Sequence, residues 1–235
     1  ATNDLTINAV ITGGGAGGAI TKSNVAGTLV LNAANNYGGG TTLQGGVLAL
    51  GDKAALGSGT LTFNTANSTL RGEGKNLTGI DKIANNWTYS LPGSDGNSNT
   101  LFLGGRRDFG GTYDIELSGT GSINNAALTQ ARLLNFSVLD NRNLVTLSGA
   151  IGGGGDFTVV GKQGIGTLVL SGNNTFDVRN FTAAADFDDS DGIRIEAGVL
   201  RVAHSNALGT ALQSAAVNLR GDLGAVVEID GTTAN

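Results

Sequence analysis

Apolar and polar residues alternate in short runs along much of the chain. Runs at 28–31, 47–50 and 60–63 are examples, and glycine or asparagine bounds each of them. Alternation with a period of two predicts β-strands that bury one face. No helical pattern of ten residues separates the runs, so short strands joined by Gly and Asn turns favour a solenoid over a sandwich. Both residue types suit such turns because they adopt positive φ at little cost.

Two parts of the chain are near copies of each other. The stretch AGTLVLNAANNYGG begins at Ala26, and IGTLVLSGNNTFDV begins at Ile165. A second matching pair, GGVLALGDKAALG and AGVLRVAHSNALG, begins at Gly45 and Ala197. Such repeats are typical of stacked units that share a continuous core. We therefore predict a single β-helical domain over residues 1–235, with repeat units at 1–72 and 144–235 and irregular middle rungs at 73–143.

The stacked arrangement has a predictable size and a predictable inside. Parallel strands lie ~4.8 Å apart, so about ten rungs would extend over about 50 Å. The alternation within the two copies places four leucines on the inward face: Leu29, Leu31, Leu168 and Leu170.

Composition narrows the classes of function. The chain has 40 glycines among 235 residues, no cysteine and a formal net charge of −5. The lack of cysteine excludes disulfides, thiol nucleophiles and thiolate metal sites. The acidic balance argues against nucleic-acid binding, which calls for a basic surface. No apolar run reaches the ~18 residues of a membrane helix, so we expect no transmembrane segment in this chain.

One part of the chain also resembles a known repeat family. The run LSGAIGGGGDFTVVGKQGIGTLVLSGNNTF begins at Leu147, and GVLRVAHSNALG follows from Gly198. Together they resemble the autotransporter-associated β-strand repeat of bacterial type V secretion passengers, and residues 7–57 resemble it more loosely. The resemblance implies an all-β fold, a right-handed parallel β-helix with Gly- and Asn-rich turns, that is extracellular or displayed on the bacterial cell surface. The second copy departs from the family pattern where DVRNFTAAADFDDSDG is inserted.

The insertion contains a cluster of acidic residues. Four aspartates lie close together and precede a glycine; they are Asp186, Asp188, Asp189 and Asp191. Ca²⁺ prefers carboxylate oxygens that converge from a tight turn. The spacing differs by one from the twelve-residue calcium loop, and no glutamate stands at its twelfth position. The pattern leaves two interpretations, a weak calcium site and a solvated acidic loop, and no other cofactor is indicated.

Aromatic and arginine residues gather in the irregular middle. They are Trp87, Tyr89, Arg106, Arg107 and Tyr113. These residue types dominate contact surfaces for proteins and glycans, so the group is a candidate binding site. For Trp87, packing in the core is the competing interpretation.

Two features that could indicate a binding or catalytic site have simpler structural explanations. The tripeptide RGD at 220–222 matches RGE at 71–73, which indicates a repeat turn rather than an integrin-binding loop. The sole histidine, His204, is aligned with Lys53 of the first unit, and a turn position shared with lysine indicates a solvent-facing residue. We therefore predict no catalytic site and no enzymatic activity.

The sequence favours a structural and interaction protein over two alternatives. It predicts a stalk, matrix or fibre element of an autotransporter-type passenger. No capping helix is visible near either end, so the rungs should stack head to tail on another copy or on neighbouring rungs of a longer passenger. The first alternative is a glycan- or host-binding adhesin. The second, a polysaccharide-cleaving β-helix, calls for carboxylates along one face, and the acidic residues other than the aspartate cluster are scattered.

Overall fold

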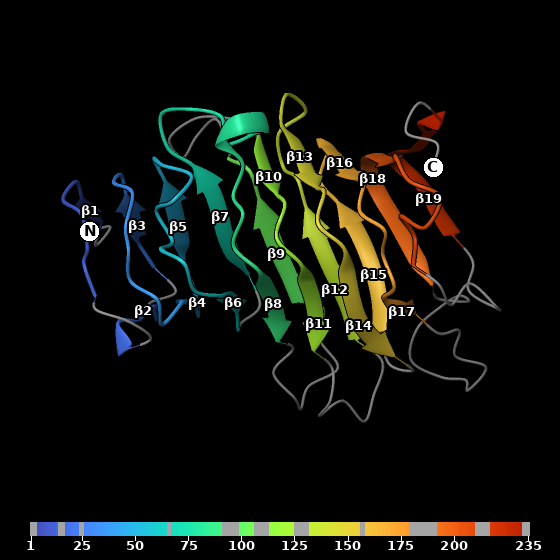
Figure 1. Cartoon of the computed structure of the whole chain (residues 1–235). Coiled ribbons are helices and arrows are strands. Elements are labelled where there is room, and N and C mark those ends of the chain that lie inside the picture. The colour runs from blue at the N-terminus through green and yellow to red at the C-terminus, as the bar shows by residue number, and fades with distance from the viewer. Residues whose placement is uncertain are drawn as a thin grey trace.

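The computed structural model contains parallel β-sheets that run the length of the chain (Figure 1). It describes residues 4–13, 17–23, 26–64, 67–90, 99–105, 113–124, 132–155, 158–178, 192–209 and 217–231. Within these ranges there is no α-helix, and every pairing between strands is parallel. No helix in the described part of the chain is long and apolar enough to cross a membrane.

The strands form two sheets. In spatial order the larger sheet contains β1 (Leu5–Ile7), β3 (Thr28–Leu31), β5 (Val47–Leu50), β7 (Ser68–Gly72), β9 (Asn99–Leu103), β12 (Arg132–Ser137), β15 (Thr158–Gln163), β18 (Ile193–Val202), β16 (Thr167–Leu170), β13 (Leu144–Leu147) and β10 (Ile115–Leu117), with β19 (Val217–Ile229) paired to β18. The smaller sheet contains β2 (Ile20–Lys22), β4 (Thr41–Leu43), β6 (Leu61–Phe63), β8 (Trp87–Ser90), β11 (Gly121–Asn124), β14 (Ile151–Gly155) and β17 (Asp177–Val178).

The larger sheet is divided into two faces by its long strand β18. Residues 193–195 of β18 pair with β15, whereas residues 199–202 pair with β16. We call the row from β1 to the first part of β18 face 1, the smaller sheet face 2, and the row of β10, β13, β16 and the second part of β18 face 3. Because the chain returns to the same face once per turn and always in parallel, the fold is a parallel β-helix, as predicted.

Face 1 gives the number of rungs. Within the described residues eight strands form face 1 and β19 adds a ninth beyond β18, close to the ten rungs that the sequence predicts. Figure 1 shows the N-terminal strands at one end of the stack and the C-terminal strands at the other. Each rung therefore contacts mainly the rung before it and the rung after it.

The inside of the helix is an apolar column. The four leucines expected to point inward, Leu29, Leu31, Leu168 and Leu170, are all buried, which confirms the predicted alternation. Their burial follows from strand geometry, since alternate side chains of a strand point to opposite faces. The column includes Phe63, which packs edge to face against Trp87 with ring centroids 6.3 Å apart.

Candidate functional site

The aromatic members of the predicted binding group lie in the core. Trp87 and Tyr89 are 2% and 0% exposed, and both pack edge to face against Phe136. Burial raises the pKa of the Tyr89 hydroxyl above its usual value. Of the rest, Tyr113 is partly exposed, while Arg106 and Arg107 lie outside the described residues. The structure thus brings Trp87 and Tyr89 together as core residues, the interpretation that the sequence kept open for Trp87.

The predicted calcium candidates also lie outside the described residues. This applies to all four aspartates, Asp186, Asp188, Asp189 and Asp191. Among the residues that the structure does describe, no group of three or more His, Cys, Asp or Glu side chains could hold a metal ion.

The structure corrects the alignment of the sole histidine. His204 Nδ1 accepts a hydrogen bond from the backbone N–H of Asn206 at 3.0 Å. In the first unit the same role belongs to Asp52, whose carboxylate accepts from the N–H of Ala54 at 2.8 Å. His204 therefore corresponds to Asp52 and not to Lys53, and its ring closes a turn. The prediction that RGD forms a repeat turn is also wrong. Arg220 and its counterpart Arg71 lie within strands β19 and β7.

The two repeat units share a buried asparagine that joins three successive rungs. Asn35 accepts a hydrogen bond from the N–H of Ile11 at 2.8 Å and donates to the carbonyl of Ala55 at 2.6 Å. Asn174 does the same with Ile151 and Ala207, at 2.8 and 2.6 Å. Each amide pairs with one backbone group on the rung before it and one on the rung after it. We call Asn35 and Asn174 the asparagine brackets. The sequence signal for them is the Asn-Asn pair near the end of each copy, whose role is not evident before the strands are paired.

A buried lysine closes a turn in each unit. Lys162 donates from Nζ to the carbonyls of Gln163, Gly164 and Ala197 at 2.8, 2.7 and 3.0 Å. Burial lowers the pKa of Lys162 to about 8. Its counterpart Lys22 donates to the carbonyl of Gly45 at 3.2 Å, and burial lowers its pKa as well. These ammonium groups bind backbone carbonyls of the protein itself, so they act as structural clamps.

Each repeat unit has a glycine at the same position, where the backbones of two rungs approach closely. Gly57 and Gly209 have φ values of 61° and 82°. A Cβ atom at these positions would overlap the carbonyl oxygens of Tyr37 and Phe176, respectively. The Ala-Leu-Gly of each repeat is thus required by backbone shape and by a close approach of two rungs.

Inward-facing side chains are exposed on the first and the last rungs that the structure describes. In register, Leu219 follows Ile195 and Ile229 follows Val202, yet Leu219 and Ile229 are 54% and 83% exposed. At the other end Leu5 pairs with the buried Leu29 and is itself 58% exposed. Side chains that would be buried inside the stack therefore meet solvent on its first and last described rungs.

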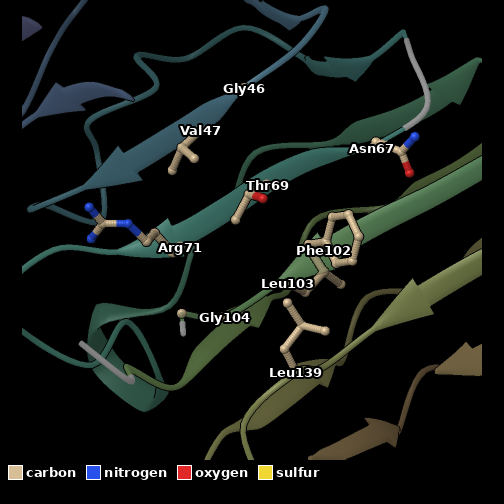
Figure 2. Close-up of a pocket in the computed structure, with 10 residues that line it drawn as sticks. Gly46, Val47, Asn67, Thr69, Arg71, Phe102, Leu103, Gly104 and Leu139 are labelled. Carbon is tan, nitrogen blue, oxygen red and sulfur yellow. The ribbon is translucent and has the colours of Figure 1, made fainter. Parts of the chain in front are cut away.

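A groove of 350 Å³ crosses the outer side of face 1 (Figure 2). Val47, Thr69, Phe102 and Leu139 line it, together with the side chain of Arg71. The Arg71 guanidinium donates to the carbonyl of Gly72 at 3.0 Å and forms an ion pair with Glu73. The lining offers an aromatic ring and apolar surface, and none of the residues named here forms a nucleophile, acid and base arrangement.

Comparison with known proteins gives one family. Residues 26–50 and 161–177 each match the family described as Passenger-associated-transport-repeat. The comparisons with curated proteins and with solved structures found no match to the chain. The two matched segments include the buried asparagines Asn35 and Asn174, and the second also includes Lys162. Since this family is a repeat of autotransporter passengers, the two matches confirm the resemblance that the sequence indicated.

Proposed function

We propose that the chain is a structural and interaction segment of an autotransporter-type passenger, secreted or displayed on a bacterial surface. It acts there as a stalk, matrix or fibre element and has no catalytic activity. The repeat matches support the passenger assignment. The observation that carries the structural role is the exposure of inward-facing residues at both ends of the stack.

An uncovered rung is a template for another strand. β19 pairs with β18 and with no other described strand, and the side chains of Leu219 and Ile229 on it are exposed. A further parallel strand would pair with β19 and cover the apolar column. The partner is either a second copy stacked head to tail, which propagates as a heterologous contact, or the neighbouring rungs of a longer passenger.

Sedimentation velocity over a concentration series tests head-to-tail stacking. We expect the wild-type chain to form larger species as its concentration rises, and the double variant Leu219→Glu/Ile229→Glu to remain monomeric. Ile80→Glu is the matched control, because Ile80 is 88% exposed but lies in the 3₁₀ turn Gly79–Asp81, away from both ends. A wild-type monomer at high micromolar concentration, or equal dissociation of the control, would contradict stacking between copies.

A glycan- or host-binding adhesin is the second candidate function, and the groove on face 1 favours it. Its volume suits a small ligand, and Phe102 supplies an aromatic ring to its lining. A glycan-array screen with wild type and Phe102→Ala tests this use of the groove. A reducing-end release assay on polysaccharides tests for catalysis, and release above background would contradict the proposed lack of activity.

A further inference from the structure

The outer side of face 2 carries a row of hydroxyl groups in register. Pairing between adjacent strands joins Thr21 to Thr42, Thr42 to Thr62, Thr62 to Thr88 and Thr88 to Ser122. We call these five residues the hydroxyl row. All are exposed or half-buried, and the structure records no hydrogen bond from their hydroxyls to other described residues. Since Thr side chains in strands have restricted χ1, the row is a regular set of unused donors and acceptors.

A second row of polar side chains runs beside the first. It comprises the residues two positions later on each rung: Ser23, Gln44, Asn64, Ser90 and Asn124. They point to the same side because side chains alternate along a strand. Every rung from β2 to β11 thus presents a hydroxyl and, next to it, an amide or a second hydroxyl.

The outward-facing side chains that the structure describes on this surface are uncharged. From β2 to β14 no described outward-facing residue is charged, although the chain contains 14 basic and 19 acidic residues. Charge complementarity therefore selects a neutral partner. Strands in a sheet repeat every ~4.8 Å, so a partner that uses the whole row must itself repeat at a similar distance.

We propose that the hydroxyl row binds a neutral, extended polysaccharide that crosses the strands, with about one sugar residue per rung. The length of one sugar in an extended β-1,4-linked chain is close to the distance between strands. Sugar hydroxyls donate and accept hydrogen bonds, as do the Thr, Ser, Asn and Gln side chains of both rows. Trp87 and Tyr89 on β8 point into the core, so hydrogen bonding along the row, and not ring stacking, holds the polymer.

The unequal lengths in the second row also indicate a flexible polymer. Gln44 and Ser90 differ in reach, which suits a chain that can adjust locally and does not suit a rigid crystal lattice such as ice. Single contacts of this kind are weak, but linked contacts act together because each later one is intramolecular. Affinity should therefore rise steeply with the number of sugars.

Depletion binding to swollen cellulose and titration with cellohexaose and cellobiose test the proposal. We expect the wild type to bind cellulose, to prefer cellohexaose to cellobiose, and to ignore polygalacturonate. The variant Thr62→Val/Thr88→Val keeps shape and strand preference but removes two hydroxyls, and should weaken binding at least fivefold. Thr146→Val, at a half-buried threonine on face 3, is the matched control and should bind like wild type. Loss of cellulose binding in Phe102→Ala would instead place the polymer in the groove on face 1.

Other outcomes would overturn the proposal. These are failure of the wild type to bind cellulose, equal binding by Thr62→Val/Thr88→Val, or equal binding of polygalacturonate. Retention of the wild type on growing ice without cellulose binding would assign the row to ordered water instead. Circular dichroism of each variant verifies that the fold is retained. Because sedimentation measures end-to-end assembly separately, failure of this proposal and failure of the structural role are distinguishable.

Discussion

Replacing Asn174 by alanine should destabilise the C-terminal half of the helix strongly. Its side chain is 0% exposed and holds the Ile151 N–H and the Ala207 carbonyl, which belong to different rungs. Alanine is too short to reach either group. The substitution leaves a buried donor and a buried acceptor without partners and removes both side-chain hydrogen bonds by which residue 174 joins the neighbouring rungs.

The expected cost follows from the number of groups left unpaired. Each buried polar group that loses its partner costs about 1–3 kcal/mol, so two such groups give about 2–6 kcal/mol. Total stabilities of domains are only about 5–15 kcal/mol. Asn174→Ala should therefore remove a large fraction of the free energy of unfolding.

The neighbouring residue provides a matched control. Asn173 is exposed, and among the described residues its side chain bonds to Asn206 alone, accepting from the Asn206 amide at the surface at 2.8 Å. Surface substitutions of this kind change stability by about 0.5 kcal/mol or less. Urea unfolding followed by circular dichroism compares the two variants, and hydrogen exchange at the Ile151 amide reports the lost bond directly. Equal urea midpoints for Asn173→Ala and Asn174→Ala, with unchanged exchange at Ile151, would refute the assignment of Asn174 as a bracket between rungs.

Three further predictions concern the core, the buried lysine and the acidic insertion. Leu168→Asp should prevent folding, because an unpaired carboxylate in the apolar column costs several kcal/mol; a native circular dichroism spectrum for this variant would contradict the inward position of Leu168. Since the pKa of Lys162 is about 8 when folded and 10.5 in its ordinary state, the folded chain loses this proton first, and the free energy of unfolding should rise from pH 8 to 10.5. Urea midpoints should show a smaller rise for Lys162→Met, and parallel pH profiles would argue against the shift. A weak calcium site in the insertion predicts a slight rise in melting temperature in millimolar calcium relative to chelator. No rise, or an equal rise in Asp188→Asn/Asp191→Asn, would leave the solvated acidic loop as the interpretation.

The alternation of residues was sufficient to predict the strands and their inward faces. The strand at Thr28–Leu31 and its copy at Thr167–Leu170 appear where the period-two pattern places them. Their leucines are buried because a stacked strand has one face in the column and one outside. Local pattern suffices here, since each rung makes its contacts with adjacent rungs of the same kind.

The pairing between strands could not be predicted from the sequence. Leu5 pairs with Leu29, Leu29 with Leu48 and Leu70 with Leu103, so one rung takes 24, 19 or 33 residues. Loops of such different lengths hide the register, because loop closure costs little extra entropy as a loop grows. The hydroxyl row and the asparagine brackets both depend on register, which is why neither is visible before the strands are paired.

Trp87 shows a different limit of sequence reasoning. An aromatic residue in an irregular region can fill a core or form a contact surface, and residue type does not separate these uses. The decision came from β6 and β8, whose pairing puts Leu61 beside Trp87 and Phe63 beside Tyr89 on the inward face. A shift of β8 by one residue along β6 would have turned Trp87 and Tyr89 outward.

The asparagine brackets also bear on how the helix responds to pulling. Under tension a solenoid should unravel rung by rung from an end, and a rung of 24 residues releases roughly 80 Å of chain at ~3.4 Å per residue. Asn35 and Asn174 each join three rungs, so force should climb before a bracketed turn gives way and then drop as two rungs extend together. Such a chain would act as a tether that resists extension most strongly at Asn35 and Asn174. Under drag it would lengthen in steps, which limits the force on its attachment.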